Sequence, residues 1–148
     1  MIKDILLKQA EDSDKKKIIE LLRSEKLPTE DLSGSLEHFI VAREGDELLG
    51  LVGLELYGHY GLLRSLVVNS KYRNQSVAGK LIIELENIAL KFGIGEIYLL
   101  TETALVYFKR KGYSEVSRNE VPVQVQQSSE FSHVCPASAV VMKKLLNK

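Results

Sequence analysis

Apolar residues from Val77 onward recur at the spacing of one face of an α-helix. They stand at positions 77, 78, 81, 82, 85, 88, 89 and 92, and at 3.6 residues per turn they predict a helix of about four turns. Gly93 and Gly95 follow, and glycine is common just beyond a helix end. A helix of this kind among strand-like segments is typical of a mixed α/β fold.

Strand-like segments precede this helix. Residues 38–44 and 47–58 are rich in β-favouring side chains and flank the turn pair Gly45-Asp46. This pattern predicts an antiparallel hairpin. A third strand at residues 61–69 leads to the helix.

The rest of the chain continues the alternation of strands and helices. Residues 4–10 predict a first strand, after which Asp12 and Ser13 are the expected caps of a helix that Pro28 stops. Beyond the long helix we expect a strand, a helix, a strand, an irregular polar run and a last strand, at residues 96–101, 103–111, 113–117, 118–136 and 138–146.

The composition indicates one soluble globular domain over residues 1–148. Apolar residues make up 45% and charged residues 27%, with 20 basic and 20 acidic side chains, a balance that favours neither nucleic acid nor membrane as a partner. The amino terminus has early charges and no long apolar run, so we expect no signal peptide and a cytoplasmic location. With one cysteine, Cys135, we predict no internal disulfide and no metal site.

A basic loop joins the strand at 61–69 to the long helix. Residues 74–79 would present backbone N–H groups at a helix start, where the helix dipole favours negative charge, and Arg73 and Lys80 add full positive charges. The loop is therefore suited to a diphosphate. An ordinary solvated connection is the alternative, and a dinucleotide-binding βαβ unit is disfavoured because the loop lacks G-x-G-x-x-G.

The order of the elements and the loop sequence NSKYRNQSVAGKLI together resemble the GNAT acetyltransferases. That family places Arg/Gln-x-x-Gly-x-Gly/Ala here to bind pyrophosphate, and Arg73 and Ala78 match its first and last positions. Ser76 stands where the family prefers glycine, and it hinders an anion only slightly if its φ is negative. The resemblance implies a GNAT fold, a mixed and mostly antiparallel sheet splayed around an acetyl-CoA site and flanked by helices.

The resemblance also implies which residues hold acetyl-CoA, the cosubstrate. The strand before the loop contributes main-chain contacts to the pantetheine arm. Thr103 lies near the place of a family asparagine, although Thr101 and Thr103 would equally suit a cap for the next helix. The residues expected at the cofactor are Leu66, Val67, Val68, Arg73, Asn74, Gln75, Ser76, Val77, Ala78, Gly79, Lys80, Thr103 and Phe108.

A narrower resemblance, to the type-2 arsenic-resistance N-acetyltransferases, rests on LPTEDL, FIVAREGDELLGLVGLELYG, LLRSLVV, YLLTETALVYFKRKGY and EFSHVCPASAVVMKK. It implies acetyl transfer from acetyl-CoA to an amine. Soft arsenic(III) prefers several thiolate ligands, and the chain offers one. Any arsenic is therefore expected to arrive within an amine-bearing compound.

Candidate substrate and catalytic residues lie on the hairpin strands. Arg64 interrupts an apolar run, where it is expected to bind an acidic group of the substrate, to pair with Glu55 or to face solvent. Glu55 and Tyr57 share one strand face, and Glu55 is the first candidate to accept the ammonium proton. Tyr57 and Glu30 are further candidates for substrate contacts.

Phe108 occupies the place where many GNAT enzymes carry a tyrosine near the CoA sulfur. Tyr107 is adjacent and is the candidate proton donor, but one helical residue turns a side chain by about 100°, so it is expected to face elsewhere. The CoA thiol has a pKa near that of free cysteine, about 8.5. Its thiolate is therefore a tolerable leaving group without a dedicated acid.

The predicted function is acetyl transfer from acetyl-CoA to a primary amine of a small molecule, with an acidic amino-acid-like compound as one candidate class. Two alternatives stay open: a sensor module that binds acyl-CoA without turnover, and a peptide or protein N-acetyltransferase. A second copy of the chain is a candidate partner.

Overall fold

The computed structural model describes residues 5–25, 38–73, 76–128 and 139–146. Residue contacts divide the chain into two compact units. The first unit comprises Met1–Leu54 and Ser65–Asn87, and the second comprises Glu55–Arg64 and Ile88–Lys148. The expectation of a single domain stays a prediction.

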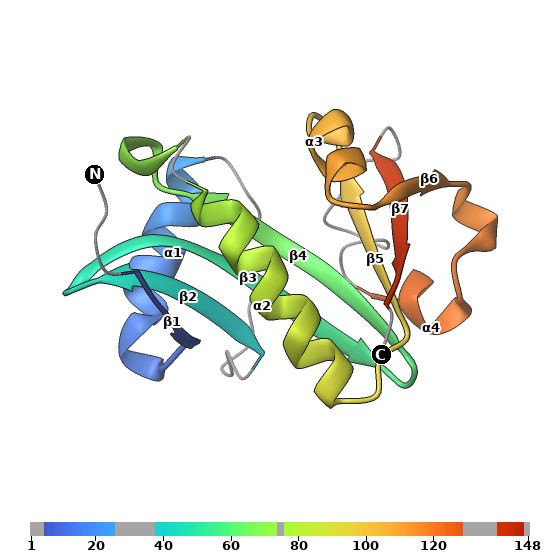
Figure 1. The fold of residues 1–148 in the computed structure, drawn as a ribbon, viewed down its shortest axis with the longest axis horizontal. Coiled ribbons are helices and arrows are strands. Elements are labelled where there is room, and N and C mark those ends of the chain that lie inside the picture. Colours follow the sequence, from blue (N-terminus) through green and yellow to red (C-terminus); the bar gives the residue numbers. More distant parts are fainter. Residues whose placement is uncertain (1–4, 26–37, 74–75, 129–138, 147–148) are drawn as a thin grey trace. The chain divides into compact units, whose positions relative to one another are not determined.

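Seven strands form one sheet in the order β1-β2-β3-β4-β5-β7-β6 (Figure 1). The pairs β1–β2, β2–β3, β5–β7 and β6–β7 are antiparallel, whereas β4 and β5 run parallel. This agrees with the mixed, mostly antiparallel sheet expected from the sequence. The strands are β1 (Leu6–Gln9), β2 (Phe39–Glu44), β3 (Glu47–Tyr57), β4 (Tyr60–Val68), β5 (Glu96–Thr101), β6 (Ser114–Val116) and β7 (Val140–Leu145).

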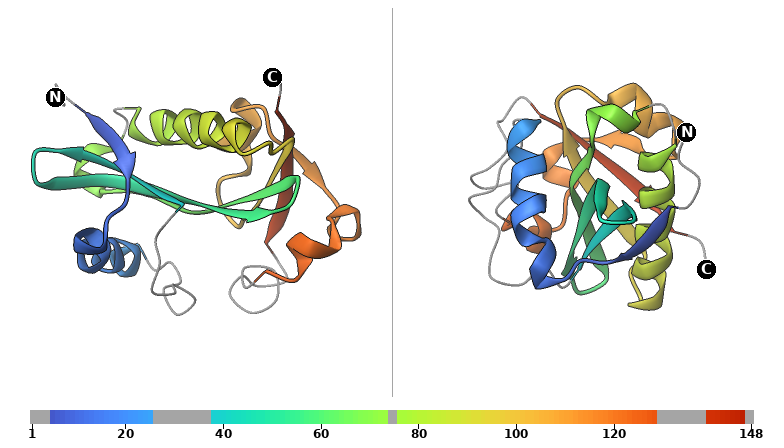
Figure 2. Two further views of the ribbon diagram at one scale, coloured as in Figure 1. Left: turned by 90° about the horizontal axis from the view of Figure 1, so that it is seen from below. Right: turned by 90° about the vertical axis from the view of Figure 1, so that its left-hand side faces the viewer.

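In the first unit, two helices lie on opposite faces of the strands. Figure 2 shows α1 (Lys15–Ser24) on one face and the amino-terminal part of α2 (Val77–Lys91) on the other. The hairpin of β2 and β3 turns at Gly45, whose φ of 60° suits glycine. The predicted hairpin and the predicted start of α2 at Val77 are confirmed.

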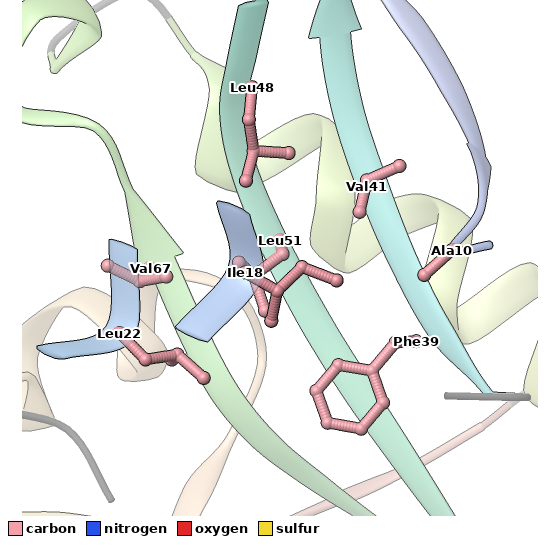
Figure 3. Close-up of a cluster of buried hydrophobic side chains, with 8 residues drawn as sticks. All are labelled: Ala10, Ile18, Leu22, Phe39, Val41, Leu48, Leu51 and Val67. Carbon is pink, nitrogen blue, oxygen red and sulfur yellow. The ribbon is translucent and has the colours of Figure 1, made fainter. Parts of the chain in front are cut away.

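A core of the first unit fills the space under α1. Alternate residues of β2 point toward α1 because successive strand side chains face opposite sides of a sheet. Ile18 and Leu22 of α1 are fully buried against them. The cluster, drawn in Figure 3, consists of Ala10, Ile18, Leu22, Phe39, Val41, Leu48, Leu51 and Val67.

The start of α1 differs from the prediction. Asp12 and Ser13 belong to a 3₁₀ turn, η1 (Asp12–Asp14), and α1 begins only at Lys15. The Asp14 carboxylate accepts the Glu11 backbone N–H at 2.8 Å and the Arg43 guanidinium at 3.0 Å. These two bonds hold the buried Asp14 within η1, and α1 begins at the next residue.

The second unit packs short elements around β5 and β7. The bounds of β5 are the predicted ones, and the helix α3 (Leu105–Arg110) ends before Gly112, whose φ is 97°. The buried core cluster of the second unit consists of Leu62, Tyr98, Val121, Val125 and Val141.

Part of the run predicted as irregular is folded. A 3₁₀ turn, η3 (Arg118–Glu120), and a short helix, α4 (Val123–Gln126), follow β6. The Glu120 carboxylate accepts the Ser117 N–H at 3.0 Å, and Val121 and Val125 are buried. Isolated apolar residues in a polar run do not form a periodic pattern strong enough to predict such short turns. Within the described ranges, no helix is long and apolar enough to span a membrane.

Candidate functional site

The predicted cofactor loop lies between β4 and α2 in the first unit. Asn69 caps a 3₁₀ turn, η2 (Ser70–Tyr72), because its side chain accepts the Lys71 N–H at 3.1 Å. After Asn74 and Gln75, which lie outside the described residues, α2 begins at Val77. A helix of 15 residues thus starts where the sequence predicted an anion site.

Ser76 has a φ of 65°, so the condition of a negative φ, under which its side chain would hinder an anion only slightly, is not met. In this left-handed region the Cβ of an L-residue approaches the following carbonyl oxygen, at a cost of about 1–2 kcal/mol. Glycine avoids this cost. The replacement of the motif glycine by Ser76 therefore strains the backbone, in addition to placing a larger side chain there.

Small and basic side chains follow at the helix start. Val77 is buried, Ala78 and Gly79 are half-buried, and Lys80 is exposed. The Lys80 N–H donates to the Ser76 carbonyl oxygen at 3.1 Å, which closes the first helical turn. The three N–H groups of residues 77–79 have no earlier turn to donate to, as at any helix start.

The cations of the loop pair with acids from distant parts of the first unit. The Arg73 guanidinium binds the carboxylate of Glu25, at the end of α1. Lys71 Nζ lies 3.4 Å from Glu47 Oε2, and the Tyr72 hydroxyl donates to Glu47 Oε1 at 2.5 Å. That hydrogen bond lowers the pKa of Glu47 and raises the pKa of Tyr72. No local pattern in the sequence links these partners.

The predicted main-chain segment of β4, Leu66 to Val68, follows a backbone irregularity. Ser65 has a φ of 59°, far from extended geometry. The strand continues to Val68, and the Asn69 N–H donates to the Leu49 carbonyl oxygen at 2.7 Å.

Gly50 of β3 permits a close approach to this part of β4. A Cβ at Gly50 would lie 2.7 Å from the Val67 carbonyl oxygen and 3.3 Å from Cδ1 of Leu81, on α2. Only a residue without a side chain fits there without a shift. Gly50 therefore helps to set where β4 and α2 lie, a role that sequence inspection missed.

Three predicted residues meet in the second unit. Arg64 Nη1 donates to Glu55 Oε2 at 2.8 Å, and the Tyr57 hydroxyl donates to Glu55 Oε1 at 2.5 Å. The Arg64 side chain is 2% exposed, whereas that of Glu55 is 28% exposed. Of the alternatives for Arg64, pairing with Glu55 is the observed one. A contact to a substrate stays a prediction.

Tyr57 extends this cluster to the segment just after α4. Burial raises the pKa of the Tyr57 hydroxyl above its usual value, and the hydrogen bond to Glu55 raises it further. The buried side chain of Ser128 also hydrogen-bonds to Tyr57. Tyr57 is thus neutral at physiological pH and serves as a donor to Glu55. Glu30, the remaining candidate near the substrate, lies outside the described residues.

On α3, Phe108 is buried with its ring edge-on to Tyr113, at 5.6 Å between centroids. Tyr107 is half-buried, and Lys111 Nζ lies 5.4 Å from its ring centroid. Burial raises the pKa of Tyr107. Tyr107 and Phe108 therefore have different surroundings, as their neighbouring positions on a helix require.

The threonines at the end of β5 also differ from each other. Thr101 Oγ1 accepts the Ala104 N–H at 3.0 Å, which is the capping alternative. Thr103 is exposed. Its predicted contact to the cofactor stays a prediction.

Comparisons with known proteins place this arrangement among acyl-transferring proteins. A model of the acetyltransferase (GNAT) family matches residues 2–113. An uncharacterised N-acetyltransferase from Chlorobaculum tepidum is 26% identical over 101 residues, which cover 68% of this chain and 64% of that protein.

Solved structures show the same fold. N-acetylglutamate synthase from Neisseria gonorrhoeae, complexed with coenzyme A and N-acetyl-glutamate, matches 99% of this chain and 36% of its own length, at 16% identity and a TM-score of 0.87. An acetyltransferase from Staphylococcus aureus matches 97% of this chain and 100% of its own, at 21% identity and a TM-score of 0.78. The chain thus spans 64% of the Chlorobaculum protein and 36% of the Neisseria enzyme.

Proposed function

Because the chain belongs to the acetyltransferase (GNAT) family, we propose that it is an N-acetyltransferase that moves an acetyl group from acetyl-CoA to a primary amine of a small molecule. The family match is the observation that carries the proposal. It covers residues 2–113, which include the whole loop before α2 and the start of that helix. The fold is the GNAT fold that the sequence predicted.

The loop before α2 fits the diphosphate of acetyl-CoA. A helix start offers backbone N–H groups and the positive end of a dipole to an anion. Ala78 and Gly79 present little bulk there, and Lys80 is exposed. Arg73, 54% exposed, adds a second cation. In the Neisseria enzyme, coenzyme A is present in a structure of the same fold.

For the acceptor we propose a small amine that also carries an acidic group. Arg64 places a guanidinium beside the Glu55 carboxylate, 2.8 Å from Oε2, in the part of the chain where the acceptor is expected. The Neisseria enzyme was solved with N-acetyl-glutamate, the product of acetylating an acidic amino acid. The acidic product in the Neisseria structure favours an acidic acceptor over a polyamine.

Glu55 is the proposed proton acceptor. The amine nitrogen attacks the thioester carbonyl carbon, the C–S bond breaks, and the CoA thiolate leaves. The proton lost by the amine passes to the Glu55 carboxylate, directly or through water. Hydrogen bonds from Arg64 and Tyr57 fix the orientation of this carboxylate.

The test is release of free thiol from acetyl-CoA against a panel of amines. The panel contains glutamate, aspartate, neutral amino acids, polyamines, aminoglycosides, short peptides, and phosphinic and arsonic analogues of the acidic amino acids. Turnover of acidic amino acids above neutral ones is the expected result. A preference for the arsonic analogue would support the narrower resemblance to arsenic-resistance enzymes.

Two results would contradict the proposal. Binding of acetyl-CoA without thiol release for any amine would favour the sensor alternative. Turnover confined to peptides would favour a peptide N-acetyltransferase.

A further inference from the structure

Arg73, the first residue of the loop motif, is already engaged by an anion of the protein. Its guanidinium binds the Glu25 carboxylate. Glu25 stands at the carboxyl end of α1, where its backbone N–H donates to the carbonyl oxygens of Leu22 and Arg23. The helix end therefore fixes the position of Glu25, and the pair joins two segments of the first unit that lie 48 residues apart.

The pair is accessible to a ligand from solvent. The Arg73 side chain is 54% exposed and that of Glu25 is 24% exposed. A guanidinium has five N–H donors but only one positive charge, and one close anion is enough to neutralise that charge. A diphosphate that approaches Arg73 therefore meets a cation whose charge is taken, and a carboxylate that repels it.

We propose that Glu25 is an internal competitor for the diphosphate, which holds Arg73 while the loop is empty and gives it up when acetyl-CoA binds. This inference rests on the proposed function, since it requires that the loop bind acetyl-CoA. Glu25 then sets the affinity for the cofactor without touching it. It weakens binding of any ligand with a diphosphate and leaves the choice of acceptor unaffected.

A second acid near the loop supplies a matched control. Glu47 pairs with Lys71 and accepts a hydrogen bond from Tyr72. Lys71 and Tyr72 precede the motif, whereas Arg73 belongs to it. Glu25→Gln and Glu47→Gln each remove one negative charge from the first unit, but only Glu25→Gln frees a cation of the motif.

The experiment is calorimetric titration of acetyl-CoA into the full chain and its variants. Glu25→Gln should bind about two- to fivefold more tightly than the wild type, the range expected from releasing one exposed ion pair. Glu47→Gln should stay within about twofold of the wild type. In an Arg73→Gln background, adding Glu25→Gln should change the affinity much less, because the competition acts through Arg73.

Several outcomes would overturn the inference. Equal affinities of Glu25→Gln and the wild type would show that the pair does not compete with the ligand. Weaker binding by Glu25→Gln would show that Glu25 preorganises Arg73 for the cofactor. Glu25→Ala serves as a second variant if the first has a lowered melting temperature. If the wild type binds no acetyl-CoA, the proposed function fails instead, and this result is distinct from the others.

Discussion

Ser76 combines a left-handed backbone with a side chain at the start of α2. Ser76→Gly removes the strain of about 1–2 kcal/mol and adds an entropy cost of about 0.5–1 kcal/mol. We expect the free energy of unfolding to rise by up to about 1.5 kcal/mol, with equal or tighter binding of acetyl-CoA. Urea denaturation measures this. Ser70→Gly, at a serine without a positive φ, should destabilise instead, and a gain there too would refute the backbone explanation.

Arg64 is the residue that distinguishes acidic from neutral acceptors in the proposed function. Arg64→Leu should raise KM for acidic amines by about tenfold or more, because a charged hydrogen bond is worth about 1.5–3 kcal/mol. Neutral amines should change less, and acetyl-CoA affinity little. The control is Arg43→Leu, which breaks the pair with Asp14 at 3.0 Å in the first unit. Equal losses for acidic and neutral amines with Arg64→Leu would make Arg64 structural.

Tyr107 tests whether a general acid is needed. Tyr107→Phe should keep kcat within about tenfold, whereas loss of a true general acid costs about 10²-fold or more. Steady-state kinetics at saturating acetyl-CoA measure this. A hundredfold fall with unchanged cofactor affinity would assign Tyr107 the acid role. A gain in kcat with Phe108→Tyr would indicate a proton donor that the native chain lacks.

Among the elements, the packing of β3, β4 and α2 depends on Gly50. In Gly50→Ala the new Cβ forces the Val67 carbonyl and Leu81 to move, and we expect a loss of about 1–3 kcal/mol in stability together with weaker acetyl-CoA binding. Gly58→Ala is the control, because its φ of 65° is strained for alanine but no atom lies within 4 Å of the new Cβ. It should lose stability and keep its affinity. Equal losses of acetyl-CoA affinity in both variants would show that the close contact at Gly50 has no specific effect on binding.

The elements were predictable from the sequence where a local period was strong. The hairpin at Gly45, the start of α2 at Val77 and the bounds of β5 follow from patterns within a few residues of each element. The turns η1 and η3 and the helix α4 were not, because buried contacts of Asp14, Val121 and Val125 stabilise them. Such contacts come from residues far apart in the chain.

At the scale of the whole molecule, the order of the elements was enough to predict the fold. The site was predictable only in part. The loop motif and the shared face of Glu55 and Tyr57 are local, and the structure confirms that face. The partner of Arg73 lies 48 residues away, and the positive φ values of Ser65 and Ser76 are ones that no short pattern predicts for serine.

Alkaline pH should destabilise the folded chain through its buried tyrosines. Burial raises the pKa of Tyr98, which is 2% exposed, and its hydrogen bond to Glu96 raises it further. The unfolded chain ionises tyrosine near pH 10, so stability is full below that pH and falls above it by up to about 1.4 kcal/mol per pH unit for each such tyrosine. Urea midpoints at rising pH measure the slope. Tyr98→Phe should flatten it, and an unchanged slope would assign the effect to other groups.

The two compact units are interleaved along the chain. Each consists of two separate stretches of sequence, and the boundaries fall within β3, β4 and α2. A fragment cut from one end that contains all of one unit also carries part of the other: residues 1–87 include Glu55–Arg64 of the second unit, and residues 55–148 include Ser65–Asn87 of the first. A truncation or a recombination event at a single point can therefore pass on one whole unit only together with a piece of the other.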